Sequence, residues 1–125
     1  MHKYKILLVD DEIDLVEVLA FQFEDVGYSV LKAFTLHDAA SKIKSESPDI
    51  VLSDMRMPGG SGLELLRECK LLPNPPYFAI FSGHTNLDIK SLKEQGVDVV
   101  LSKPISFESL MESLSGGASL KKISG

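Results

Sequence analysis

Hydrophobic residues in this chain gather in short apolar runs that alternate with longer segments of mixed polarity. The segments 6–9 and 50–52 are entirely apolar, and 97–101 is interrupted only by Asp98. Short runs bounded by polar residues are typical of strands buried on both faces of a parallel sheet. The segments between them are long enough for helices, so the pattern predicts repeated strand–helix units.

Five strands and five helices follow from this pattern. The predicted strands are 4–10, 28–34, 49–54, 77–82 and 97–101, and the predicted helices between them are 12–26, 36–46, 63–72 and 86–95. Gly27 is placed to end the first helix, and Thr85 and Asp88 have the spacing of a capping box for the fourth. Regular alternation of this kind predicts an α/β fold whose parallel sheet carries helices on both faces.

A fifth helix is predicted to begin after Ser106. Its apolar residues recur at helical spacing and would lay one stripe against the sheet; they are Phe107, Leu110, Met111 and Leu114. Gly116 and Gly117 are expected to end this helix. We therefore expect one domain over residues 1–115 and a flexible tail or linker stub over 116–125.

Composition excludes several classes of protein. A chain of 125 residues forms one domain, and a net charge of −5 without a basic cluster opposes binding to nucleic acid. The single cysteine, Cys69, cannot form an internal disulfide and lies in a helical pattern, where we expect a packed thiol in a cytoplasmic protein. No apolar stretch is long enough for a signal peptide or a membrane span.

Polar residues with chemical potential stand where the predicted strands end. Asp10 and Asp11 follow the first strand, Asp54 the third and Lys103 the fifth, while Ser82 ends the fourth. Ligands of open α/β sheets bind outside the carboxyl ends of the strands. Several carboxylates that face one ammonium group there indicate a divalent cation and a phosphoryl group.

Each of these residues taken alone has an ordinary structural explanation. The Asp10–Asp11 pair would cap the first helix, Asp54 would stabilise a turn, and Lys103 would be a solvated surface lysine. Agreement at four strand ends favours a shared site over four separate coincidences.

These motifs together resemble the receiver domain of two-component response regulators. The resemblance covers residues 4 to about 114 and rests on the Asp10–Asp11 pair, on Asp54-Met55-Arg56-Met57-Pro58 followed by Gly62, on Ser82-Gly83 and on Lys103-Pro104. It implies a flavodoxin-like (βα)5 fold, a three-layer sandwich with five parallel strands in the order 2-1-3-4-5. No output domain follows in this sequence, so we expect a stand-alone regulator or a receiver cut from a longer protein.

The resemblance implies a phosphoryl-accepting site that depends on a metal ion. Asp54 would be the nucleophile that becomes an acyl phosphate. Asp11 and Asp54 would bind Mg²⁺, or Mn²⁺ in its place, with Asp10 acting through water and the backbone carbonyl of Arg56 completing the set. The donor would be a histidine of a kinase or of a phosphotransfer protein.

The remaining pocket residues have implied roles around the phosphoryl group. Lys103 would supply a positive charge and Ser82 a hydroxyl to its oxygens. The rim of the pocket would consist of Met55, Gly83, His84 and Pro104. Arg56 and His84 each lie two residues past a site residue, and we expect them to set the rate at which water removes the phosphoryl group.

The first predicted helix is the expected partner surface. Leu15, Leu19, Phe23 and Val26 form its predicted core stripe, whereas Phe21 projects among acidic residues. Such an exposed aromatic is either an isolated surface hydrophobe or a partner anchor. Because receivers generally dock their phosphodonors near this helix, the partner surface is expected at Leu15, Val18, Phe21 and Gln22.

One position departs from the pattern of the family. Many receivers carry an aromatic residue three positions before the active-site lysine, but this chain has Val100, which has no ring to reorient. This departure favours a relay over a switch, and it mildly favours a pseudo-receiver that acts without phosphate. A related Mg²⁺-dependent phosphohydrolase would usually carry its nucleophile after the first strand with a second aspartate two residues later, where this chain has Glu12.

Overall fold

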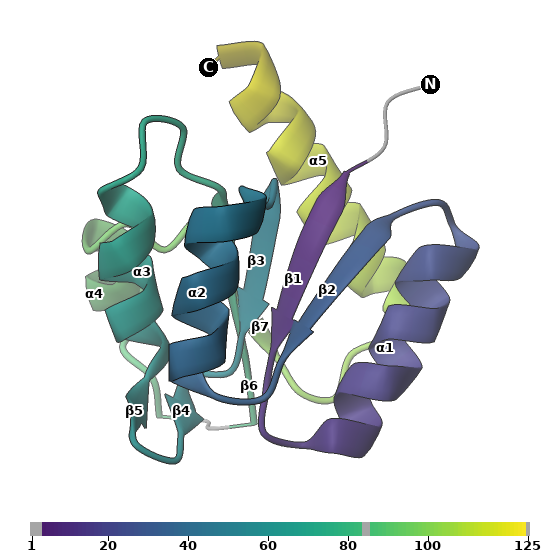
Figure 1. The fold of residues 1–125 in the computed structure, drawn as a ribbon, viewed down its shortest axis with the longest axis horizontal. Helices are drawn as coiled ribbons and strands as arrows, with labels where there is room; N and C mark the ends of the chain where they lie inside the picture. Colours follow the sequence, from purple (N-terminus) through teal and green to yellow (C-terminus); the bar gives the residue numbers. More distant parts are fainter. Residues whose placement is uncertain (1–3, 84–85, 125) are drawn as a thin grey trace.

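A five-stranded parallel sheet forms the middle layer of the molecule (Figure 1). The computed structural model describes residues 4–83 and 86–124. The strands of the sheet are β1 (Lys5–Val9), β2 (Ser29–Ala33), β3 (Ile50–Ser53), β6 (Tyr77–Ser82) and β7 (Val99–Ser102). Their order is β2-β1-β3-β6-β7, which is 2-1-3-4-5 when the five parallel strands are counted along the chain. The flavodoxin-like prediction is therefore confirmed.

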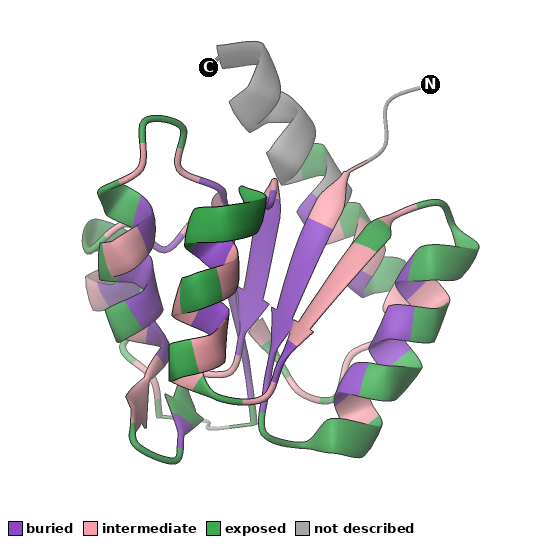
Figure 2. Ribbon diagram, in the orientation of Figure 1, coloured by how far each residue is buried: buried purple, intermediate pink, exposed green. Residues whose placement is uncertain are grey.

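Helices cover both faces of this sheet. Helices α1 (Ile13–Asp25) and α5 (Phe107–Ser124) pack on one face, and α2 (Leu36–Glu46), α3 (Gly62–Lys70) and α4 (Ile89–Glu94) pack on the other (Figure 1). Neighbouring residues of β1 point to opposite cores, since Leu7 and Val9 join the core under α2 and α3 while Ile6 and Leu8 join the core under α1 and α5. Burial on both sides is why β1 and β3 are almost continuous apolar runs, whereas the edge strands β2 and β7 are only partly buried (Figure 2).

The first helix is rotated relative to its predicted core stripe. Its buried residues are Val16, Leu19, Ala20 and Phe23. Of the predicted stripe, Leu15 is half-buried and packs against the core, whereas Val26 is 47% exposed, so the assignment of Val26 is wrong. Val26 fails because the helix ends at Asp25 and Val26 has already left the helical conformation. Cys69 is buried as predicted.

Two local elements differ from the sequence prediction. The segment 57–62, whose Pro58 and glycines predict a turn, is largely part of a small antiparallel hairpin of β4 (Arg56–Met57) and β5 (Gly60–Ser61). Helix α4 begins at Ile89, three residues later than predicted, because Asp88 itself is the N-cap and accepts a hydrogen bond from the Ser91 amide at 3.1 Å. Thr85, the expected partner in a capping box, lies outside the described residues.

Helix α5 does not end at the glycine pair. It continues through Gly116 and Gly117 to Ser124, so the predicted end of this helix is wrong. Gly27, by contrast, has φ of +101° and follows α1 as a helix stop should. The backbone of Gly116 is helical instead, because glycine lowers helix stability without forbidding a helix. The division of the chain at residue 115 stays a prediction.

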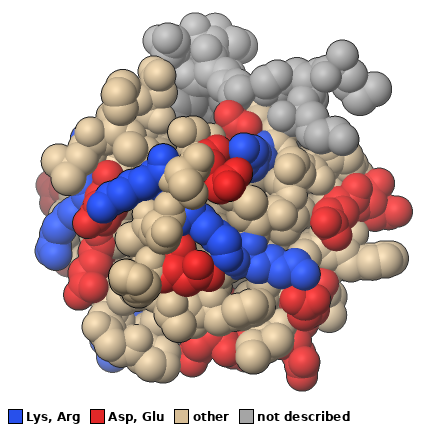
Figure 3. All heavy atoms as spheres, viewed as in Figure 1, with Lys and Arg blue, Asp and Glu red and all other residues tan. Residues whose placement is uncertain are grey.

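Charged residues of both signs are distributed over the surface, as the balanced composition predicts. On the face shown in Figure 3, basic and acidic side chains are interspersed over the sheet and its helices. Among the described residues, none of the helices is both long and apolar enough to cross a membrane.

The helical conformation of Gly116 predicts that Gly116→Ala stabilises the protein. Within the described part of the chain, nothing lies within 4 Å of a Cβ built on Gly116. Alanine should therefore raise the free energy of unfolding by about 0.5–1 kcal/mol, measured by urea denaturation. Gly27→Ala is the matched control and should destabilise, since its φ is positive. Destabilisation by Gly116→Ala would contradict a helical residue 116.

Candidate functional site

The carboxyl ends of the strands bring the predicted site residues to one edge of the sheet. Hydrogen bonding between strands continues one residue past their ends, from the Asp54 amide to the Val9 carbonyl at 2.9 Å and from the Lys103 amide to the Ser82 carbonyl at 2.9 Å. These bonds fix the backbone where each functional side chain begins. The three strand arrows labelled β1, β2 and β3 point to this edge, beside the β4–β5 hairpin (Figure 1).

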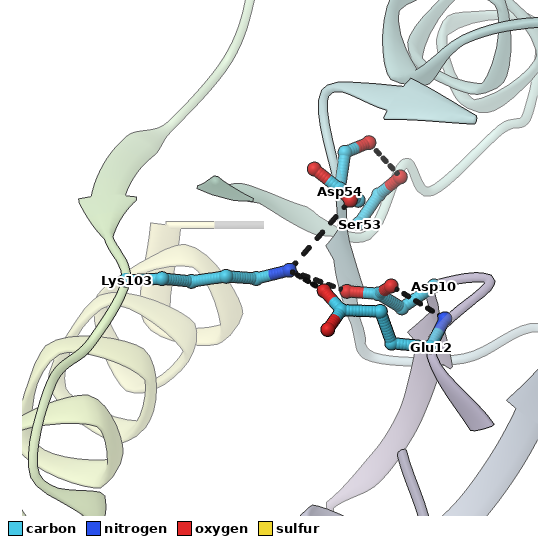
Figure 4. Close-up of polar contacts among 5 residues, drawn as sticks. All are labelled: Asp10, Glu12, Ser53, Asp54 and Lys103. Atoms are coloured by element: carbon cyan, nitrogen blue, oxygen red, sulfur yellow. Dashed lines mark hydrogen bonds and ion pairs between the residues drawn. The ribbon is translucent and has the colours of Figure 1, made fainter. Parts of the chain in front are cut away.

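Lys103 lies at the centre of the site. Its Nζ is 2.7 Å from Asp10 Oδ2, 3.2 Å from Glu12 Oε1 and 3.6 Å from Asp54 Oδ2. Figure 4 shows the lysine side chain extended from the segment that follows β7 toward all three carboxylates. One ammonium group facing three acids leaves an excess of negative charge.

Asp10 has two roles at once. Its Oδ2 pairs with Lys103, while its Oδ1 accepts a hydrogen bond from the Glu12 amide at 2.9 Å, next to the first residue of α1. The residue is only 5% exposed. Asp10 therefore does not cap α1, whose N-cap is Glu12, but orders the backbone just before the helix with one oxygen and pairs with Lys103 through the other.

The same acids form a candidate metal site. One carboxylate oxygen each from Asp10, Glu12 and Asp54 lies within 4.8 Å of the others. Hard oxygen donors with excess negative charge fit Mg²⁺ or Mn²⁺. Asp11 is exposed and is not part of the group found among the described residues, where Glu12 takes the third place. The predicted ligand roles of Asp11 and of the Arg56 carbonyl stay predictions.

Burial and neighbouring charges act on the ionisation of Asp54 in opposite directions. Burial raises the pKa of the Asp54 carboxyl, and Lys103 opposes this shift with its positive charge. The Asp10 charge adds to the increase and hydrogen bonds from the backbone at Met55 and Arg56 reduce it, so the pKa stays above its usual value. The charged form of Asp54 is therefore less favourable here than in water.

The acids favour the charged form of the lysine. Burial alone would lower the pKa of Lys103, but the hydrogen bond to Asp10 and the charges of Asp10 and Asp54 raise it. Lys103 is thus held as a fixed positive charge. Its Nζ also lies over the Phe81 ring, 5.4 Å from the ring centre, in a cation–π contact.

Residues on both sides of the β4–β5 hairpin hydrogen-bond to the backbone at Asp54 and Met55. The Gly62 amide donates to the Met55 carbonyl at 2.8 Å, and the Ser53 hydroxyl donates to the Asp54 carbonyl at 2.8 Å. A Cβ at Gly62 would lie 2.7 Å from the Asp54 carbonyl oxygen, which explains why a residue without a side chain stands there.

The structure places the other predicted pocket residues as follows. Ser82 is buried at the end of β6, Met55 is half-buried, Gly83 is exposed, and Pro104 follows Lys103 through a cis peptide bond. His84 lies outside the described residues. Sequence reasoning missed Glu12 and Phe81 as neighbours of Lys103, although Glu12 continues the acidic run after the first strand.

A groove beside the site contains most of the predicted partner surface. Leu15, Val18 and Gln22 of α1 line it together with Glu12, Leu19, Phe81, Lys103, Pro104, Ile105 and Phe107. Phe21, the fourth predicted partner residue, is 72% exposed and lies outside the residues that line the groove. Lys103 thus faces the acidic site and also borders the groove.

The raised pKa predicts that removing the Asp54 charge stabilises the protein. A carboxyl whose folded pKa exceeds its unfolded pKa costs stability once pH has risen through both values. At pH 7 with a chelator present, Asp54→Asn should raise the free energy of unfolding, and the gain should shrink at acidic pH. Urea denaturation at both pH values measures this. Asp14→Asn, a change of an exposed acid, is the control, and a less stable Asp54→Asn protein would contradict the expectation.

Comparisons with known proteins agree with this geometry. The family model described as the response regulator receiver domain matches residues 6–115. A CheY-like receiver domain protein from Methanospirillum hungatei is 27% identical with a TM-score of 0.90, and the match covers 99% of this chain and 100% of that one. A receiver domain protein from Clostridium thermocellum is 30% identical with a TM-score of 0.88, covering 98% and 99%.

A third similar structure contains a modified aspartate and bound ligands. It is a response regulator from Burkholderia pseudomallei with a phosphorylated aspartic acid, a calcium ion and citrate, 25% identical with a TM-score of 0.82, and the match covers 97% of this chain and 72% of that one. The strand-end acids, the lysine that pairs with them, the sheet order and the family match lead to one conclusion. This chain belongs to the receiver domain family of two-component response regulators.

Proposed function

We propose that this receiver accepts a phosphoryl group on Asp54 from a histidine of a partner kinase or phosphotransfer protein, in the presence of Mg²⁺ or Mn²⁺. The observation that carries the proposal is the position of Lys103, whose Nζ lies 2.7 Å from Asp10 and 3.6 Å from Asp54. This places a fixed positive charge beside the carboxylate that would be modified.

The proposed reaction is an in-line displacement at phosphorus. An ionised oxygen of Asp54 attacks, a new O–P bond forms, and the P–N bond to the donor histidine breaks, returning the electron pair to the imidazole. Lys103 offsets negative charge on the phosphoryl oxygens, and the Ser82 hydroxyl bonds one of them. Arg56 and His84 at the rim would then govern how readily water reaches the acyl phosphate.

The acids around Asp54 fit the metal that this chemistry uses. Asp10, Asp11, Asp54 and the Arg56 carbonyl would hold the ion, with Glu12 nearby. When bound, Mg²⁺ supplies the charge neutralisation that lets a carboxylate approach an anionic phosphoryl group. The Burkholderia pseudomallei relative, with its phosphorylated aspartic acid and calcium ion, supports both parts of the proposal.

A pseudo-receiver that acts only through protein contacts is the second candidate. Val100 supports it, because this half-buried residue packs against the core under α2 and α3 and has no ring to move. The intact set of acids and lysine favours phosphorylation, and Val100 then indicates a relay with a limited change at the α4–β7–α5 face.

The groove beside Lys103 is the proposed docking site for the phosphodonor. Receiver domains interact with histidine kinases and with downstream effectors, and a donor histidine must reach Asp54. Val18 is 57% exposed at the edge of this groove, and Leu15 and Gln22 line it. Apolar side chains at the mouth of a charged site suit a helix that presents its histidine toward Asp54.

Phosphorylation of Asp54 is tested by intact-protein mass after incubation with acetyl phosphate and Mg²⁺. Wild type should gain one phosphoryl group, and both chelation of the metal and Asp54→Asn should abolish the gain. Asp49→Asn, at the other end of β3, is the control that should keep it. A folded wild-type protein that gains no mass under any condition would favour the pseudo-receiver.

Docking at the groove predicts a selective defect in Val18→Ser. Transfer from a phosphorylated histidine donor that labels wild type should slow by about tenfold, as for a moderate interface hot spot. Labelling by acetyl phosphate should stay unchanged. Leu71→Ser, 82% exposed just after α3, is the control. Phe21→Ala tests the role of Phe21 in the same assay. A similar slowing of transfer from the histidine donor identifies a partner anchor, and an unchanged rate identifies an isolated surface hydrophobe.

A further inference from the structure

The Glu12 side chain does not bond the backbone amides of its helix, as an N-cap side chain often does. Glu12 is the N-cap of α1, but among the described residues its side chain makes no capping hydrogen bond. It reaches across to the last strand instead, where Oε1 lies 3.2 Å from Lys103 Nζ. The contact joins residues 91 positions apart, so it depends on the folded sheet.

The three acidic partners of Lys103 differ in how easily each can be released. The side chains of Asp10 and Asp54 are 8% and 13% exposed, whereas that of Glu12 is 63% exposed. A buried carboxylate that loses its partner stays poorly hydrated, which is costly. The Glu12 carboxylate would instead pass into water at little cost. Its hydrogen bond is also the longer of the two that Lys103 donates to carboxylates.

A phosphoryl group on Asp54 would need a hydrogen bond from the same ammonium group. Lys103 has three N–H donors; two of them are donated to Asp10 and Glu12, and Asp54 lies 3.6 Å from the same nitrogen. A phosphoryl group that takes more than one donor from Lys103 must therefore displace one of these two acids. Exposure and distance both identify Glu12 as that partner.

We propose that Glu12 is a displaceable partner that holds Lys103 before phosphorylation and leaves it when the phosphoryl group binds. Glu12 is then a positioning residue that competes with the phosphoryl group for the lysine and slows phosphorylation. The proposal rests on the proposed function and adds a restraint to it. No bond other than the ion pair and its hydrogen bond changes in this exchange.

Two substitutions separate the contact from the charge. Glu12→Gln keeps the length of the side chain and removes its charge. Glu12→Asp keeps the charge but shortens the side chain by one methylene, which withdraws the carboxylate from Lys103. Asp14→Asn removes one charge from an exposed acid in the first turn of the same helix, and so measures the general effect of charge on an anionic donor.

The experiment measures the initial rate of phosphorylation by acetyl phosphate at saturating Mg²⁺, with urea denaturation confirming that each variant is folded. Glu12→Gln and Glu12→Asp should both be about two- to five-fold faster than wild type, the ratio that an exposed ion pair corresponds to. Asp14→Asn should match wild type.

Other outcomes overturn the inference. A gain in Glu12→Gln and Asp14→Asn but not in Glu12→Asp would assign the effect to charge alone. Unchanged or slower rates in both Glu12 variants would show that Glu12 does not restrain the lysine. If neither wild type nor any variant gains a phosphoryl group, the proposed function fails and this inference fails with it. If all the proteins are phosphorylated at the same initial rate, only the inference is overturned.

Discussion

The ion pair between Lys103 and Asp10 joins the end of the last strand to the end of the first, 93 positions apart in the chain. Their side chains are 16% and 8% exposed, so neither charge is well hydrated. Removing either partner would leave a buried charge without compensation, which is far costlier than losing an exposed pair. The pair therefore fixes where the ammonium group lies, and with it the contacts that Lys103 makes with Asp54 and Glu12.

The buried strands beside this pair hold the backbone from which the site residues project. Strands β1 and β3 are buried on both faces, with apolar cores above and below them (Figure 2). The functional side chains stand just past these strands, where the ladder of hydrogen bonds ends and the backbone turns toward solvent. The two apolar cores stabilise the strands, and this offsets the cost of gathering several acids at their ends. The acids lie outside the cores, where a ligand can reach them.

Strand ends are predictable from the sequence because buried parallel strands leave an unambiguous apolar run. The apolar runs alone predict that Asp10, Asp54 and Lys103 lie together, while the order of the strands comes from the family resemblance. Spacing does not report side-chain direction in a turn, which is why Glu12 rather than Asp11 meets Lys103. The continuation of α5 past Gly116 is also beyond the sequence pattern, since a glycine is tolerated in either a stop or a helix.

Pairing of β7 with β6 brings Lys103 to the acids of the site, and among the described residues β7 is the last strand along the chain. A chain emerging during synthesis has Asp10, Glu12 and Asp54 long before Lys103 appears. Until the last strand docks, these acids have no lysine beside them to offset their charge. The proposed acceptance of a phosphoryl group would thus require the complete sheet, because Lys103 reaches the acids only when β7 has paired with β6.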